Sequence, residues 1–376
     1  MRDVVIPTGI TRLPLNLGET KHGKLKAAQW HSLFAYVIPL IILELYVDDP
    51  QDIPMDSNKR NIIVNIGYLT QCTNIVCAKS VSDADANHFE SLYKKYTLSS
   101  KKIFHNLIIK PNHHYALHIP EQIRMWGPLG QVAEFAGERL IGVLQNFWLT
   151  YGIYVSGEMD RTMMRRFCQL QRLMADHPIV EDISLGDDPG PLNSRSQEKK
   201  NRIELDDEEY EALLSYVQIK SPDARDHRKL PHPPNAKVFQ PYVAPTKTWK
   251  VSDRVSVSVL KPNNCIEFKQ HGKVQYGFVR QIYHFATPEG KWNTVFLVNP
   301  INNLFPKDLD STSKDFRYIL FLLKAVVGIV EEEFTYLSPQ SVSCVAAYRL
   351  LPPHTFGIAE AGIILRPSDY NSQLSI

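Results

Sequence analysis

The sequence predicts an α+β protein, with a helical N-terminal domain, a linker, and a small antiparallel, barrel-like β domain. In the first half of the chain, apolar residues recur at about helical spacing, whereas from Val251 onward they alternate with a period of two. Between these parts the composition shifts to Gly, Pro, Ser and charged residues. We therefore expect a helical domain at 1–180, a linker at 181–250 and a β-rich domain at 251–376.

The helical half is expected to contain five helices. Pro39 lies inside the apolar pattern of the first, which predicts a kink or break there. Asn58 is a candidate N-cap for the second helix, and Ser82 or Asp83 for the third, because their side-chain oxygens can accept hydrogen bonds from the first helical turn. The expected helices cover residues 24–47, 58–77, 82–96, 131–149 and 157–174, with a loop-rich segment at 110–128 that is punctuated by Pro and Gly.

The region 181–250 is expected to be a flexible linker with one short helix. Its polar stretches, such as SLGDDPGPLNSRSQEKKNR, cannot bury enough apolar surface to fold on their own. Residues 206–218 are the part with amphipathic helical spacing.

The β domain is predicted from segments rich in β-branched and aromatic residues, such as RVSVSVL, YGFVRQIYHF and WNTVFLVNPI. Asn263, Gly272 and Pro288 lie between such segments, as turn residues lie between short strands. One helix is expected within this domain, at about 316–331.

Composition sets limits on function. Lys+Arg 42 against Asp+Glu 40 gives a formal net charge of +2, so any contact with nucleic acid must come from a local patch. Five scattered cysteines do not form a disulfide framework and favour a reducing compartment, nuclear or cytoplasmic. Cys72 and Cys77 are the one close pair; they suit half a zinc site or, as the default, buried thiols. The apolar stretch 33–47 is short and contains Pro39 and Glu44, so no membrane span is expected.

The segment 109–178 carries a family resemblance. It contains PNHHYALHIPE and then GPLGQVAEFAGERLIGVLQ, followed by an arginine-rich stretch. In this order and spacing the elements resemble the conserved domain that follows the catalytic domain in CACTA (En/Spm)-type DNA transposases, in particular those encoded by fungal transposons. The upstream stretch LKAAQWHSLFAYVIPLIIL is also similar. The signature positions include Asn112, His113, His118, Arg139 and Gly142.

Two departures from the family pattern concern the second element. The family usually has a tryptophan where this chain has 132–134, and Pro-Phe before Glu-Arg where this chain has Ala136 and Gly137. The resemblance also implies a catalytic domain with two acidic residues upstream of all these elements. About two dozen residues precede the first match, so we expect the chain to lack that domain and to be a non-catalytic fragment.

Intact relatives are metal-dependent transposases in which three acids from distant segments hold Mg²⁺, and two metal ions activate water and stabilise the leaving oxygen. The resemblance makes Glu138 the candidate for a relic of the third acid. The plain alternative is a helix glutamate paired with Arg139. Glu134, four residues earlier, would share its helix face, either to hold a cation or as part of a solvated stripe. No cofactor and no metal site is expected for the chain alone, and a separate catalytic transposase chain is a possible partner.

Basic residues predict two areas that can meet phosphates. The first is a helix face that could equally be a solvated surface; it comprises Arg161, Arg165, Arg166 and Arg172. The second lies near the loop-rich segment and comprises Lys94, Lys95, Lys101, Lys102 and Lys110. DNA is therefore one expected partner.

The histidines His113, His114 and His118 lie close together in the sequence, but no acid or cysteine has a spacing that would complete a metal site. We expect them to make structural hydrogen bonds. His114 and His118 would share a face if this segment is helical.

The aromatic residues of the β domain allow a rival function. They could line a peptide pocket, as in small chromatin-reader barrels, or they could be alternating core residues, which is the expected case. A pocket would make the chain a protein-interaction scaffold without nucleic-acid binding. The residues are Tyr276, Phe278, Tyr283, Phe285 and Trp292.

Overall fold

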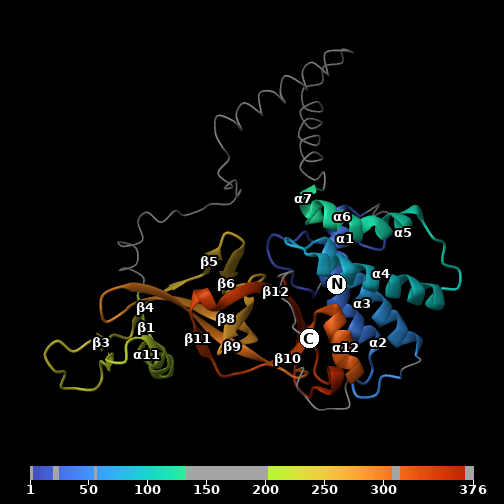
Figure 1. The fold of residues 1–376 in the computed structure, drawn as a ribbon. Helices are drawn as coiled ribbons and strands as arrows, with labels where there is room; N and C mark the ends of the chain where they lie inside the picture. Colours follow the sequence, from blue (N-terminus) through green and yellow to red (C-terminus); the bar gives the residue numbers. More distant parts are fainter. Residues whose placement is uncertain (1–2, 20–24, 55–56, 133–201, 307–313, 369–376) are drawn as a thin grey trace, which may run out of the picture. The chain divides into compact units, whose positions relative to one another are not determined.

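The computed structural model describes residues 3–19, 25–54, 57–132, 202–306 and 314–368 (Figure 1). The described residues from 3 to 130 and from 202 to 368 belong to one compact unit. The described part has helices toward its N-terminus and a closed antiparallel barrel toward its C-terminus, which confirms the predicted α+β class. The expected helices at 131–149 and 157–174 lie outside the described residues.

The first helical run consists of α1 (Ala27–Ser32), one π-helical stretch (Leu33–Val37) and α2 (Ile38–Tyr46). The change in helical period lies directly before Pro39, which has no N–H to donate to the preceding turn. The run Ala27–Tyr46 is long and apolar enough to cross a membrane, but 44% of its most apolar window is buried inside the structure. Its buried face, which includes Ala35, Leu40 and Leu43, belongs to the largest hydrophobic core.

Two longer helices follow, α3 (Asn58–Val76) and α4 (Asp83–Ile103), and they pack against each other. Ser82 caps α4 as predicted: its hydroxyl accepts from the Asp85 N–H and the Asp85 carboxylate accepts from the Ser82 N–H. The N-cap of α3 is Ser57, which accepts from the Arg60 N–H at 3.1 Å, and the predicted cap Asn58 is already the first helical residue.

The predicted loop-rich segment contains short helices instead: α5 (Pro111–Tyr115), a 3₁₀ turn (Ala116–His118), α6 (Ile119–Trp126) and α7 (Leu129–Val132). Pro111 and Pro120 stand at helix starts, where the missing N–H has no intrahelical partner to lose. Ile123 is buried where α6 packs on α4, and Gly127 ends α6 with a φ of 73°.

Six antiparallel strands close the barrel in the order β8-β7-β12-β13-β10-β9-β8. They are β7 (Cys265–Gln270), β8 (Lys273–Ala286), β9 (Trp292–Asn303), β10 (Val326–Val330), β12 (Val342–Leu351) and β13 (Gly362–Pro367). Closure leaves no exposed edge in this ring. Phe268, Val298 and Val345 belong to one of the clusters packed on its strands. The closed ring agrees with the predicted barrel.

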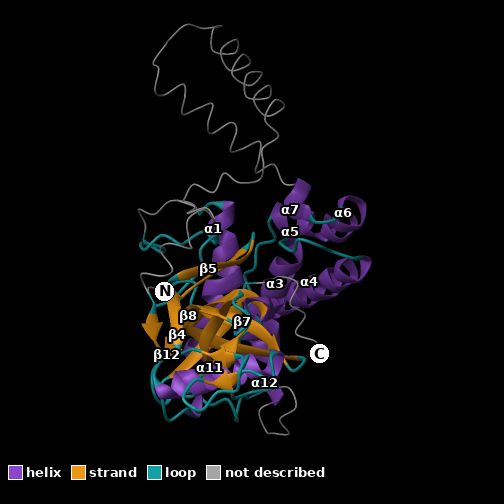
Figure 2. Ribbon diagram, turned by 90° about the vertical axis from the view of Figure 1, so that its left-hand side faces the viewer, coloured by secondary structure: helices purple, strands orange, loops and turns teal. Residues whose placement is uncertain are grey.

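The hairpin β8–β9 extends beyond the barrel and carries a second sheet, in the order β1-β4-β8-β9-β11. Figure 2 shows two of its strands, β4 and β8, beside each other. The added strands are β1 (Ile203–Glu204), β4 (Tyr242–Thr246) and β11 (Thr335–Leu337). Helix α11 (Asp207–Lys220) packs on this sheet through Tyr210, Leu213 and Val217, against Phe239 and Phe285. Two short pairs complete the strands: parallel β2 (Arg225–Asp226) with β3 (Val238–Phe239), and antiparallel β5 (Thr248–Ser252) with β6 (Val255–Ser258).

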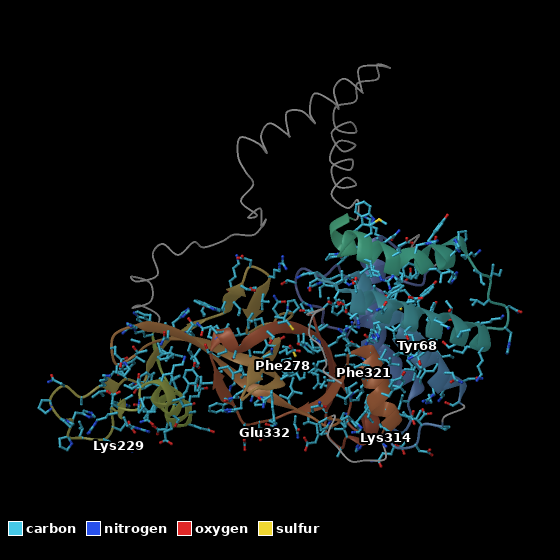
Figure 3. All side chains as sticks on the ribbon, in the orientation of Figure 1. Tyr68, Lys229, Phe278, Lys314, Phe321 and Glu332 are labelled. Carbon is cyan, nitrogen blue, oxygen red and sulfur yellow. The ribbon has the colours of Figure 1, made fainter. Side chains whose placement is uncertain are left out.

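Helix α12 (Lys314–Leu323) lies between β9 and β10 in the sequence but packs against α3 (Figure 1). Gln71 of α3 donates to the Leu322 carbonyl at 2.7 Å, and a Cβ on Gly67 would lie 2.8 Å from the Leu322 Cβ. Tyr68 on α3 and Phe321 on α12, both labelled in Figure 3, pack at the margin of the same core. The helices and the barrel therefore share one hydrophobic core, whereas the sequence predicted two separate domains.

Two further differences concern element boundaries. The region 202–250, expected to be a linker, supplies β1–β4, part of β5 and helix α11, which is the one helix predicted there. The helix expected at 316–331 ends at Leu323, because Lys324 adopts a left-handed φ of 51°, and the apolar run after it forms β10. The apolar pattern is continuous across this break, so it did not reveal the change of structure.

Candidate nucleic-acid interface

Residues 91–120 contain no Asp or Glu and carry five lysines: Lys94, Lys95, Lys101, Lys102 and Lys110. All five side chains are exposed. In the described part of the chain, none of them has a carboxylate within ion-pair distance. Lys101 and Lys102 lie in the last turn of α4, where a cation is favoured by the helix dipole. We call this segment the basic surface.

The signature histidines hold the backbone of the basic surface together. The Nδ1 atom of His113 accepts a hydrogen bond from the Lys110 N–H at 3.0 Å, which secures the start of α5. The Tyr93 hydroxyl donates to the His113 carbonyl at 3.0 Å and ties α5 to α4. The rings of His114 and His118 meet edge to face at 5.2 Å, so they share a face as expected. The contacts of His113 are structural, and Asn112 beside it is exposed.

The basic surface and the start of the next helices also expose many large apolar side chains. Ile108 and Ile109 are 70% and 75% exposed in the loop before α5, and Trp126 is 61% exposed at the end of α6. Exposed apolar residues in such numbers mark interaction surfaces. The others in this region are Leu98, Phe104, Leu107, Tyr115, Leu117 and Met125.

A second candidate site is a groove of about 580 Å³ beside the second sheet, which we call the barrel groove. Its wall combines the last turns of α11 with β5, the β8–β9 turn and the segment 338–340. Three aromatic side chains at its surface, Tyr216, Trp249 and Trp292, come from three different elements. The volume is within the range of about 300–1,000 Å³ that is usual for sites holding small ligands.

The charge of the barrel groove is positive. Lys220, Lys250 and Lys291 line it, and Glu289 is the one acidic residue among its lining side chains. Glu289 is paired with Lys237 at 3.2 Å, and this bond holds the pKa of the Glu289 carboxyl below its ordinary value. Lys237 also pairs with Asp223 at 2.8 Å, so it offsets only part of the Glu289 charge.

The predicted β-domain aromatics divide between core and groove. Tyr276, Tyr283 and Phe285 are buried, and burial raises the pKa of Tyr276 and Tyr283 above the ordinary range. Phe278, labelled in Figure 3, packs at the margin of a core cluster and meets Tyr348 edge to face at 4.9 Å. Trp292 is 38% exposed in the groove. Sequence reasoning missed Tyr216 and Trp249, because the tertiary packing of α11 and of the β5–β6 hairpin, not sequence spacing, brings them to the same groove.

Several predicted site residues lie outside the described residues: Glu134, Glu138, Arg139, Gly142, Arg161, Arg165, Arg166 and Arg172. Cys72 is buried and Cys77 half-buried, and burial raises the pKa of both thiols, to about 12 and about 11. Within the described ranges, no group of three or more His, Cys, Asp or Glu side chains is arranged to hold a metal ion.

Comparison of the chain with family models, with curated proteins and with solved structures gives no match.

Proposed function

We propose that this chain is a transposase-derived protein of the CACTA type that associates with nucleic acid through the basic surface and does not cut it alone. One observation carries the proposal: the acid-free segment 91–120, which holds all of the family-like PNHHYALHIPE element except its last residue, Glu121, presents five exposed lysines. A polyanion is the partner that such a surface attracts.

The lysines suit phosphates for a physical reason. A lysine held in a close, well-ordered ion pair with a carboxylate gains little from a phosphate, because the two anions compete for it. Lys101 and Lys102 have no such neighbour among the described residues and stand at the end of α4. Each phosphate they neutralise would release condensed counterions, which favours binding at low salt.

The test is binding of the full chain to a fluorescein-labelled DNA duplex, followed by anisotropy across a salt series. The variant Lys101→Gln/Lys102→Gln should weaken binding roughly tenfold, and it should reduce the slope of log K against log salt by up to about 2, or about 1 per lost phosphate contact.

The matched control is Lys269→Gln/Lys273→Gln, which removes two exposed lysines from the β7–β8 turn. It should leave affinity and slope close to those of the unaltered chain. Equal losses in both double variants would mean that total charge, and not the basic surface, drives binding, and the proposal would then be wrong.

The absence of cutting by the chain alone is part of the proposal. Glu138 would be the remnant of the third acid, and a separate catalytic chain would have to supply the two missing aspartates and the Mg²⁺ site. Mixing such a chain with this one should then restore magnesium-dependent nicking of terminal-repeat DNA, and Glu138→Ala should abolish it. Nicking by this chain alone would contradict the proposal.

A second candidate function is favoured by the barrel groove. Its aromatic side chains suit a protein-interaction scaffold with a reader-like β domain that binds no nucleic acid. The same salt series separates the two functions, because a peptide held in an aromatic pocket lacks the steep slope that counterion release produces. DNA binding that is absent at low salt would favour the scaffold.

A further inference from the structure

We propose that the barrel groove binds a short single-stranded stretch of nucleic acid, with bases stacked on Trp249 and Trp292 and phosphates beside Lys220, Lys250 and Lys291. This inference depends on the proposed function in one respect, that the partner of the chain is a nucleic acid. It adds a site on a different part of the fold and a preference for single strands.

Both tryptophans contact neighbouring side chains, and Trp249 also packs against a core cluster. Trp249 meets the ring of His284 edge to face at 5.1 Å, and the His284 Nδ1 atom lies 2.8 Å from the Thr294 Oγ1 atom, within hydrogen-bond distance. The guanidinium of Arg202 lies over the Trp292 ring at 4.9 Å and covers part of it. Rings that are fixed in this way lose little freedom when a base stacks on them.

The amino groups of the three lysines in the barrel groove are accessible to an anionic ligand. Lys291 has no carboxylate within ion-pair distance in the described part of the chain, and Lys220 lies over the Tyr216 ring at 5.5 Å. Lys250 has a fully exposed partner, Asp253, at 3.4 Å, and solvent screens such a pair strongly. Because three lysines face the single carboxylate of Glu289, the lining carries an excess of positive charge.

The same charges argue against a methylated lysine as the ligand. An aromatic cage binds a cation through the faces of its rings, and acidic neighbours strengthen that attraction. In the barrel groove, the Trp292 and Tyr216 rings already have a basic side chain over them. A second cation would be repelled by these groups, so a nucleic-acid strand fits the groove better than a reader's peptide.

Stacking on side chains also selects single strands. In a duplex, the faces of the bases are covered by neighbouring bases, whereas an unpaired strand can turn its bases onto aromatic rings. The neutral polar groups in the lining, among them Ser221, Asn293 and Gln340, can donate to or accept from bases and sugars. The groove thus offers aromatic rings for base stacking, lysines for phosphates and polar groups for hydrogen bonds, which are the three kinds of contact that a single strand makes.

The experiment uses the full chain and a fluorescein-labelled oligothymidylate, with anisotropy as the readout and thermal unfolding to check the fold of each variant. Trp292→Ala should weaken binding roughly tenfold, and Trp292→Phe should retain most of it, because base stacking on one aromatic ring is worth about 1–3 kcal/mol. Trp30→Ala is the matched control, since Trp30 is 48% exposed on α1. It should change nothing.

Three outcomes would overturn the proposal. A polyglutamate peptide that competes with the oligonucleotide as well in Trp292→Ala as in the unaltered chain would show attraction by charge alone. Tight binding of a trimethyl-lysine peptide that Trp292→Ala abolishes would show a reader site. A strand bound with unchanged affinity by Trp292→Ala and Trp249→Ala would show that the groove is not the site.

Photocrosslinking of a bromouridine-containing strand locates the contact directly. The expected crosslinks are at Trp249, Trp292 or Tyr216; crosslinks confined to the basic surface would overturn the inference and leave the proposed function standing. If Lys101→Gln/Lys102→Gln loses duplex binding but still binds the single strand, the basic surface and the barrel groove are two distinct binding sites. No binding of any nucleic acid would remove both proposals.

Discussion

The basic surface and the barrel groove both present lysines beside aromatic side chains, but they support these groups differently. In the groove, Trp249 is braced by His284, and Trp292 is partly covered by Arg202. In the basic surface, Tyr115 is 64% exposed, and the nearby Trp126, which follows it at the end of α6, is 61% exposed. The groove is therefore suited to a short strand, whereas the helical region offers a broad and weakly braced surface suited to an extended partner.

The largest expected effect is a loss of stability, and it tests whether the helices and the barrel unfold together. Phe316 on α12 is fully buried in the core that α2, α3 and the barrel share, with the rings of Phe305 and Phe356 against it. Phe316→Ala should cost about 3–5 kcal/mol of unfolding free energy, because it removes a buried ring and leaves a cavity. Urea unfolding should show loss of helix and strand signals in one transition.

The control is Tyr318→Phe on the same helix, which removes only the hydroxyl that lies 3.2 Å from the Tyr68 hydroxyl near the surface. It should shift the midpoint little. Two separate transitions in Phe316→Ala, with one at the position of the unaltered chain, would show that the helices and the barrel fold independently.

A smaller effect is expected on the affinity of the barrel groove for a single strand when the side chain that supports Trp249 is removed. His284→Ala removes the ring against Trp249 and should weaken oligothymidylate binding up to roughly tenfold by freeing the indole, with duplex binding unchanged. His105→Ala in the exposed loop of the basic surface is the comparison. If both histidine variants bind the strand equally well, bracing by His284 has no role in binding.

The smallest expected effect is on how the stability of the region around α11 depends on pH. A hydrogen bond from Arg228 is the main cause that lowers the pKa of Asp226 to about 2, and the ring of Tyr210 lies under the same guanidinium at 4.9 Å. Because the folded pKa lies below the unfolded value, this contribution is present above about pH 4 and is lost as the pH falls through about 2.

Asp226→Asn should therefore lower stability at neutral pH by about 1 kcal/mol, a figure that allows for screening by solvent, and should flatten the loss of stability in acid. Asp223→Asn breaks an exposed pair with Lys237 and should have a smaller effect. Unfolding by urea at several pH values measures both variants. If Asp226→Asn loses stability in acid as steeply as the unaltered chain does, the interaction between Arg228 and Asp226 is not the cause of this pH dependence.

The sequence predicted those features that depend on local chemistry. Ser82 caps α4 because an N-cap needs only neighbouring residues, and the strands of the barrel follow from alternation of apolar residues. Pro111 and Pro120 were interpreted as loop residues, although proline is equally suited to the first turn of a helix. The basic surface could be predicted because its lysines lie close together in the sequence.

The barrel groove could not be predicted, because its parts meet only through tertiary structure. Trp249 and Trp292 are far apart in the sequence, and Tyr216 lies in a region expected to be a linker. That region folds because Tyr210, Leu213 and Val217 find apolar partners on the second sheet, which its own composition does not reveal. The shared core with α12 was missed for the same reason.

The salt dependence of DNA binding by the unaltered full chain shows whether nucleic acid is the partner of this protein. If nucleic acid is the partner, the affinity for a labelled duplex should fall steeply between about 50 and 200 mM salt, with a log–log slope of about −0.9 for each phosphate contacted. A chain that stays unbound at the lowest salt, or binds with an affinity that salt does not change, would contradict the account.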